Sequence, residues 1–254
     1  MKARSLGVLF CVVLTQFCIC RPVSAAVYSG NGDSSAGGAI GLGSLTLADN
    51  GTTVSATLSR GIGSFNRDLV LFIDSVAGGF ASTASFNNNG TGLERAVSGL
   101  NPDGSARAIA NFAAGFRADY ALAIGTESGG MLYKLVESPD GMVLNPVRNV
   151  TLSPSMEVNE PNYRFSFDWT EIGLNPGTEN SFKFQSSYIY SAGYRYLESF
   201  ENFSSGRAGF NEVTYGNANF YGVEPVPETT TMALAVFGVV ACSVGVAKRF
   251  RRRA

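Results

Sequence analysis

Apolar and polar residues alternate one by one through much of this chain, and that spacing places successive side chains on opposite faces of a β-strand. Residues 53–59 read TVSATLS and residues 163–169 read YRFSFDW, so every second residue is apolar. Similar spacing, or a short apolar run beside glycine, predicts further strands at residues 44–47, 68–75, 106–112, 118–125, 131–137 and 182–184. With a hairpin near residue 190, we expect at least nine strands and no long helix.

Many short strands joined by glycine-rich turns predict an all-β fold, namely a two-sheet β-sandwich or jelly roll. One hairpin is encoded most clearly. Asp49, Asn50 and Gly51 separate two alternating segments, and Asn-Gly readily supplies the positive φ angles of a tight turn. The chain is also long enough to bury a sizeable hydrophobic core without disulfide bonds.

The first residues are typical of an export signal. Lys2 and Arg4 precede a mostly apolar run, and residues 23–25 (VSA) are small residues of the kind at which a signal peptidase cuts. We therefore expect residues 1–25 to be a signal peptide and the mature chain to begin near Ala26.

Composition excludes several classes of function. The chain has no histidine, and its cysteines all lie in terminal segments, at Cys11, Cys18, Cys20 and Cys242. Disulfides in residues 26–225, histidine-dependent serine triads, cysteine nucleophiles and ordinary zinc sites are therefore excluded. Between Arg21 and Lys248 the chain carries all 20 acidic residues but only 11 of its 19 basic residues. Such an acidic segment disfavours binding to nucleic acid.

The remaining polar residues do not select a catalytic centre. A glycosidase needs two facing carboxylates, and no pair is singled out by the sequence. Asp168 and Glu171 fit a capped short turn better, with Asp as N-cap, Glu at the third helical position and Gly173 at the exit. Trp169, the only tryptophan, alternates with Phe167 and is expected in the core. We expect a protein without catalytic activity.

Two segments look like counterparts of one another. Residues 68–79 (DLVLFIDSVAGG) and 119–130 (DYALAIGTESGG) each run from an aspartate through an apolar strand to a Gly-Gly turn. Together with GGMLYKL and YRFSFDWTEIGL, they make residues 68–190 resemble carbohydrate-binding modules of the family 9 type. This resemblance implies a β-sandwich with calcium and a sugar-binding aromatic clamp, and it assigns no aromatic position in this chain.

Four tyrosines close together in the sequence are candidate glycan-binding residues. They are Tyr188, Tyr190, Tyr194 and Tyr196. The first two share one face of a strand, and a turn at residues 191–193 would bring the last two alongside. Cross-strand packing explains this pattern without a ligand. If the face is exposed, flat rings beside Arg195 and Glu198 are suited to stack on a pyranose, so both interpretations stay open.

The acidic loops allow a calcium site, because calcium takes several oxygen ligands. The candidate ligands, all at strand-end loops, are Asp33, Asp74, Asp119 and Glu198. No EF-hand or nonapeptide spacing connects them, and solvated turn residues explain them equally well. No other cofactor is expected.

The chain ends in three consecutive parts. Val226, Pro227 and Glu228 are followed by 19 uncharged residues, 229–247, and then by a basic cluster. The cluster consists of Lys248, Arg249, Arg251, Arg252 and Arg253. As a helix the uncharged run would span about 28 Å, close to the hydrocarbon core of a bilayer. The basic cluster would stop transfer and stay in the cytoplasm.

This three-part end resembles the PEP-CTERM sorting signal of bacterial exosortase substrates, whose usual motif is Val-Pro-Glu-Pro; here Thr229 takes the last place. The resemblance implies cleavage by an exosortase-type processing enzyme. A plain single-pass membrane anchor is the alternative.

The sequence thus predicts three segments: a signal peptide (1–25), a β-sandwich domain (26–225) and a sorting signal (226–254). We expect an exported protein, held in the membrane by its C-terminal helix and then processed for the cell surface or exopolysaccharide matrix. The leading hypothesis is a structural or interaction protein. The alternatives are a carbohydrate-binding module that binds extracellular polysaccharide and, third, a carboxylate-dependent glycosidase.

Overall fold

A computed structural model describes residues 25–139, 141–176 and 180–222 of the chain. The predicted signal peptide, apart from Ala25, and the whole predicted sorting signal lie outside these residues. Within them, no helix is long and apolar enough to cross a membrane.

The described residues form three sheets. The first has the order β1 (Ala25–Ser29), β2 (Ser44–Asp49), β3 (Thr53–Ser59), β9 (Asn162–Asp168). The second has the order β13 (Asn219–Gly222), β10 (Ser181–Ile189), β4 (Asp68–Asp74), β6 (Tyr120–Gly125), β7 (Gly129–Ser138), β8 (Gly141–Asn149). A small third sheet has the order β11 (Phe203–Gly206), β12 (Glu212–Tyr215), β5 (Ile109–Asn111). All strand pairs are antiparallel except β12 with β5.

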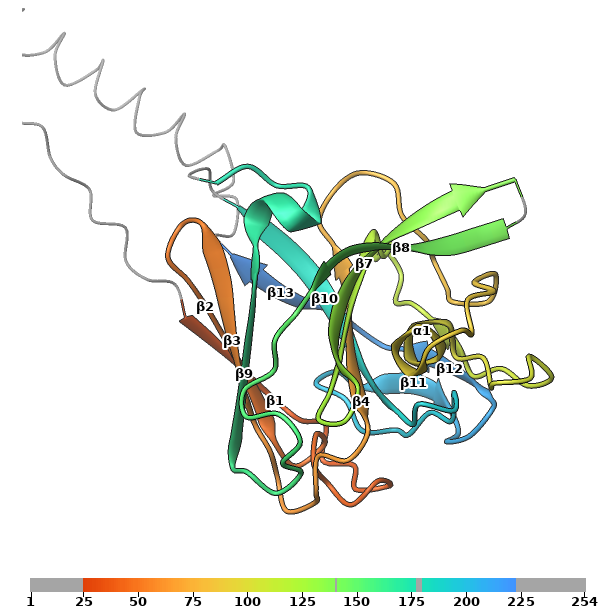
Figure 1. The fold of residues 1–254 in the computed structure, drawn as a ribbon, viewed down its shortest axis with the longest axis horizontal. Helices are drawn as coiled ribbons and strands as arrows, with labels where there is room; N and C mark the ends of the chain where they lie inside the picture. The colour runs from red at the N-terminus through yellow and green to blue at the C-terminus, as the bar shows by residue number, and fades with distance from the viewer. Residues whose placement is uncertain (1–24, 140, 177–179, 223–254) are drawn as a thin grey trace, which may run out of the picture.

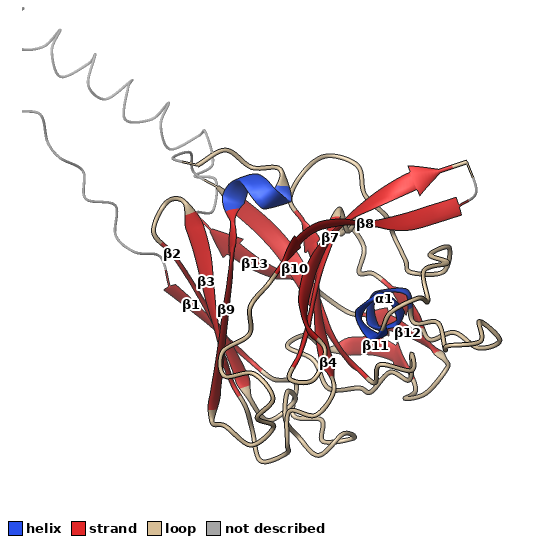
Figure 2. Ribbon diagram, viewed as in Figure 1, coloured by secondary structure: helices blue, strands red, loops and turns tan. Residues whose placement is uncertain are grey.

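The two larger sheets face each other across a common core, as Figures 1 and 2 show. The inward residues of β3, such as Val54 and Leu58, meet those of β4, such as Leu69 and Leu71. The alternation in the sequence is therefore explained by burial of one face of each strand in the first sheet. The protein is mostly β, as predicted, and its sheets are arranged as in an all-β sandwich.

A third layer covers the outer face of the six-stranded sheet, and the sequence did not predict it. Helix α1 (Gly92–Ser98) and the small sheet lie there (Figure 2), and Val97 of α1 packs in a second core with Val70 and Phe72 of β4. Because both faces of β4 are covered, its sequence is a continuous apolar run without alternation. The expectation of at least nine strands and no long helix is confirmed for the described residues, since α1 has only seven residues.

The hairpin predicted at Asn50-Gly51 is present, with Asp49 of β2 paired to Val54 of β3. The loop is shifted by one residue from Asn50-Gly51, because Asn50 N–H donates to the carbonyl of Thr53 and encloses Gly51 and Thr52; of these two, only Gly51 has a positive φ, of 88°. The Asn50 side chain instead accepts hydrogen bonds from the backbone N–H groups of Thr52 and Thr53. The asparagine therefore acts through its side chain, as in an Asx-turn.

Candidate functional site

Three neighbouring strands of the six-stranded sheet bring segments that are far apart in the sequence to the same end of the sheet. β10, β4 and β6 are adjacent and antiparallel, so the end of β10, the start of β4 and the end of β6 meet there; Ile189 pairs with Asp68. The tyrosine hairpin, residues 188–196, begins in the last residues of β10. Arg67 immediately precedes β4, and the turn of residues 126–128 follows β6. Side chains far apart in the sequence therefore collect at this end of the sheet.

The tyrosine hairpin closes at the turn that the sequence predicts. Tyr190 N–H donates to the carbonyl of Tyr194 at 2.7 Å, and Tyr196 N–H donates to the carbonyl of Tyr188 at 2.9 Å. Gly193 adopts a φ of 88°, a left-handed conformation that a residue with a Cβ atom rarely adopts. These contacts place the last two tyrosines beside the first two.

The four tyrosine rings have different environments. Tyr188 is fully buried in the core between the two large sheets and stacks on Phe65, with ring centroids 5.9 Å apart. For Tyr188 the packing interpretation therefore applies, and its ring is not available to a ligand. Tyr196 is partly buried against the same core. Tyr190 and Tyr194, in contrast, are 44% and 37% exposed.

We call the exposed rings Tyr190, Tyr194 and Phe210 the aromatic surface. Phe210 is 40% exposed and lies edge-on to Tyr194, with centroids 5.9 Å apart. Among the residues that the structure describes, these are the exposed aromatic side chains. Large exposed rings that are held in place by neighbours commonly mark a binding surface.

Arg67 lies between Tyr190 of the aromatic surface and the partly buried Tyr196. Its guanidinium lies 4.8 Å from the ring centroid of Tyr190 and 6.0 Å from that of Tyr196, and its Nε donates to the Tyr196 hydroxyl at 3.3 Å. Tyr196 in turn lies 5.1 Å from Tyr194, centroid to centroid. A cation over an aromatic face is attractive, by about 0.5–1 kcal/mol at an exposed site. Arg67 thus favours the observed position of the Tyr190 ring.

A small pocket opens beside Tyr190 at the same end of the sheet. Its volume is about 30 Å³, and its lining residues are Asn66, Arg67, Asp68, Thr126, Glu127, Ser128, Tyr190 and Ser191. Asp68 and Thr126 are buried, whereas Asn66, Glu127, Ser128 and Tyr190 are exposed. The pocket therefore has two buried polar residues surrounded by exposed ones, with an aromatic ring at its margin.

Helix α1 supports one wall of the pocket. Arg95 of α1 donates from Nε to the carbonyl of Ser191 at 2.7 Å and from an Nη atom to the carbonyl of Asn89 at 2.9 Å. The helix itself begins with a capping box, in which Thr91 and Glu94 accept each other's backbone N–H. The turn of the tyrosine hairpin is thus attached to a capped helix, which limits its motion.

Two charged residues expected beside the tyrosines are instead buried. Arg195 is fully buried and donates to the Ser187 hydroxyl and to the carbonyl of Ala108. Glu198 is also fully buried, and its carboxylate accepts four backbone N–H groups, from Ala36, Gly38, Ile40 and Gly41. The expectation that both flank the exposed rings is wrong, because each is needed to satisfy polar groups inside the fold. Arg67 is the charged residue beside the rings.

The four candidate calcium ligands do not converge on one centre. Besides Glu198, Asp33 accepts the N–H of Ser35, Asp74 accepts the N–H of Arg117, and Asp119 accepts the N–H groups of Ser75 and Val76. Among the described residues, no group of three or more acidic residues is arranged to hold a metal ion. Their contacts therefore assign these carboxylates to the stabilisation of nearby turns and loops.

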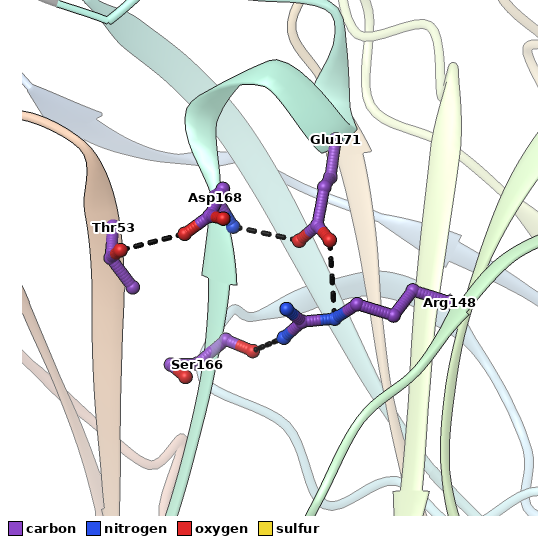
Figure 3. Close-up of polar contacts among 5 residues, drawn as sticks. All are labelled: Thr53, Arg148, Ser166, Asp168 and Glu171. Carbon is purple, nitrogen blue, oxygen red and sulfur yellow. Dashed lines mark hydrogen bonds and ion pairs between the residues drawn. The ribbon is translucent and has the colours of Figure 1, made fainter.

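The DWTEIG segment forms the capped turn that the sequence predicts, as Figure 3 shows. Asp168 N–H donates to Glu171 at 2.8 Å, and the Asp168 carboxylate accepts the Thr53 hydroxyl at 2.6 Å. Arg148 Nε lies 3.2 Å from Glu171, and the same guanidinium donates to the Ser166 carbonyl. The helical turn η1 (Trp169–Ile172) follows, and Trp169 is buried, as expected for a core residue.

Sequence reasoning missed part of this site. Arg67, Phe210 and the 126–128 turn were not identified, and Asp68 was noted only as the start of a strand. The positions lie up to 143 residues apart, and their proximity depends on the order β10-β4-β6. The only signal in the sequence was the pair of counterpart segments, which become the neighbouring strands β4 and β6.

Comparison with known proteins adds no assignment: no protein-family model matches the chain, and no similar protein was found among curated proteins.

Proposed function

We propose that this chain is an exported, non-catalytic protein of the cell surface or exopolysaccharide matrix, and that it binds polysaccharide through its aromatic surface. The observation that carries the proposal is the exposure of Tyr190, Tyr194 and Phe210, whereas most other aromatic rings of the described residues are packed in two cores. Sugar rings have apolar C–H faces that stack on such rings. The interaction hypothesis and the carbohydrate-binding alternative are thus combined.

Contacts with neighbouring side chains restrict the exposed rings before any ligand binds. Tyr190 is held by Arg67, and Tyr194 by contacts with Tyr196 and Phe210, so little side-chain entropy would be lost on binding. The pocket beside them is far too small to enclose a sugar ring, at about 30 Å³. Recognition on a surface, without a cleft around the ligand, fits a binding protein better than a glycosidase.

Replacing Tyr190 and Tyr194 together by Ala should abolish glycan retention with little loss of stability. Stacking contributes about 1 kcal/mol for each ring beyond burial, so losing both should weaken binding at least tenfold. A glycan array probed with the chain purified from an exporting bacterial host, together with thermal unfolding, would measure both effects. Val147→Ala is the control, since Val147 is 41% exposed but lies on β8. Glycan retention equal to wild type in the double variant would contradict the proposal.

The C-terminal part of the proposal is tested separately. In the native host, exosortase-type processing should remove the 26 residues that follow Glu228, and mass spectrometry of the surface fraction should find a C-terminus near that residue. Pro227→Ala combined with Glu228→Ala should leave the full-length chain in the membrane, because the recognition motif is lost. Residues 251–253 present in the mature wild-type protein would instead indicate a permanent anchor.

A further inference from the structure

The two counterpart aspartates occupy reciprocal positions but have different contacts. Asp119 precedes β6, and its Oδ2 accepts the N–H groups of Ser75 and Val76, at the exit of β4, both at 3.0 Å. Asp68 starts β4 and lies beside the exit of β6, so close that a methyl group on Gly125 would lie 2.0 Å from its Oδ1. The turn after β6, however, donates no backbone hydrogen bond to Asp68 among the contacts that the structure describes.

Asp68 is therefore a buried carboxylate in which one oxygen accepts no hydrogen bond from the described part of the chain. The residue is only 3% exposed, and its Oδ2 has no hydrogen-bond partner among the described residues. Such a group loses its hydration without compensation, which is costly. Burial raises the pKa of Asp68 to about 6, and the charge of Glu127 acts in the same direction. The Ser128 hydroxyl and the charges of Arg95 and Arg67 partly oppose that rise.

Asp68 is one of the lining residues of the pocket, so the pocket offers a donor a route to this carboxylate. Its volume of about 30 Å³ has room for a hydroxyl or hydroxymethyl group, and the exposed ring of Tyr190 lies at its margin. A sugar ring that stacks on Tyr190 would therefore stay outside the pocket, while one of its substituents enters.

We propose that Asp68 is a specificity-determining residue of the polysaccharide site: a neutral sugar stacked on Tyr190 inserts one hydroxyl group into the pocket and donates its hydrogen bond to the Asp68 carboxylate. This inference rests on the proposed function and adds the class of sugar. Two carboxylates, those of Asp68 and Glu127, line the pocket, so they disfavour a uronate at this position. The nearby guanidiniums of Arg67 and Arg95 are already engaged, with tyrosine rings and with carbonyl groups.

Asp68→Asn is the decisive variant, because it preserves shape and removes the charge. The amide oxygen can still accept a hydrogen bond from a hydroxyl group. A hydrogen bond to a charged acceptor, however, is roughly twice as strong as one to a neutral acceptor, so losing the charge should weaken binding about tenfold. The probes are neutral hexasaccharides of glucose, mannose, galactose and xylose, with polygalacturonate as the acidic probe. Titration calorimetry of the chain purified from an exporting host should show at least one neutral probe bound, and polygalacturonate bound more weakly than it.

The pH dependence of binding gives a second readout. The ionised carboxylate is the stronger acceptor, so the affinity of the wild type should rise as the pH increases through about 6, whereas Asp68→Asn should show no such rise. The groups facing this carboxylate, Arg67, Arg95, Glu127 and Tyr133, are unchanged in the variant. An affinity of the wild type that stays constant between pH 5 and 8 would contradict the role of Asp68.

Stability separates loss of the subsite from loss of the fold. The folded-state pKa of Asp68 is raised, so its neutral form stabilises the fold at low pH and that contribution is lost as the pH rises through about 6. Asp68→Asn should therefore melt no lower than wild type at pH 8. The matched control is Asp119→Ala, which removes the acceptor of the Ser75 and Val76 N–H groups and should lower the melting temperature while leaving glycan affinity unchanged.

Two further outcomes separate failure of the Asp68 subsite from failure of the proposed function. If Asp68→Asn keeps the wild-type affinity while the double variant at Tyr190 and Tyr194 loses it, the pocket holds water only and the subsite proposal is overturned, although the proposed function stands. If the wild type binds none of the probes, both proposals are overturned.

Discussion

Replacing Glu198 by Gln should destabilise the protein by roughly 3–6 kcal/mol, because a buried carboxylate that accepts several N–H groups has no neutral equivalent. Two N–H groups, of Ala36 and Gly38, donate to one carboxylate oxygen at 2.7 Å. Two more, of Ile40 and Gly41, donate to the other at 2.9 and 3.3 Å. Whichever oxygen the amide NH₂ replaces, two buried or partly buried backbone donors lose their acceptor.

Urea unfolding at constant pH measures this effect as a lower midpoint with a similar slope. The control is Glu157→Gln, since Glu157 is exposed and its backbone carbonyl, which the substitution retains, is the acceptor of the Tyr163 hydroxyl. A loss for Glu198→Gln as small as that of the control would show that the loop of residues 30–43 is held by other contacts.

Gly193→Ala should lower the melting temperature by roughly 6–12 °C, corresponding to about 3 kcal/mol or more for a domain of this size. Gly193 has a φ of 88°, and a Cβ atom there would lie 2.4 Å from the carbonyl oxygen of Leu100 and 2.8 Å from that of Gly99. Both neighbours are backbone atoms at the end of α1, so neither can move without disturbing the helix. The substitution should also displace Tyr190 and Tyr194 and reduce glycan binding.

Gly115→Ala separates the two causes of that loss. Gly115 has a φ of 76°, but nothing lies within 4 Å of the position that its Cβ would take. Its substitution should therefore cost only the left-handed backbone conformation, about 1–2 kcal/mol. Thermal unfolding of the two variants in parallel measures the difference. Equal effects would mean that the backbone around Leu100 yields easily to a methyl group.

Local patterns predicted the local structures well. The alternation in β3 and β9, the position of the Asn50-Gly51 hairpin and the capped turn after Asp168 depend on residues within a few positions of one another. Each is determined by side-chain period, by turn chemistry or by a cap, so the chain encodes it without its tertiary surroundings.

Burial of individual residues was harder to predict, and the tyrosine hairpin shows why. Tyr188 and Tyr190 share one face of a strand by period, yet the first is in the core and the second is exposed. The difference arises at the end of β10: Tyr188 lies inside the strand and packs in the core, whereas Tyr190 follows the last residue, Ile189, and its ring lies beside Arg67. Arg195 and Glu198 were expected beside the rings on an exposed face, but both are buried, where they form hydrogen bonds with backbone groups.

The sequence by itself determined the strand pattern, the absence of histidine and of any cysteine from residues 26–225, and the three-part C-terminal end with its predicted sorting signal. Only the tertiary structure decided that Arg67 and Asp68 lie beside Tyr190, and that a third layer covers β4. The physical reason is the range of the interactions. Period, turns and caps act over a few residues, whereas the order β10-β4-β6 is set by burial of both sheet faces, which sums contacts from the whole described chain.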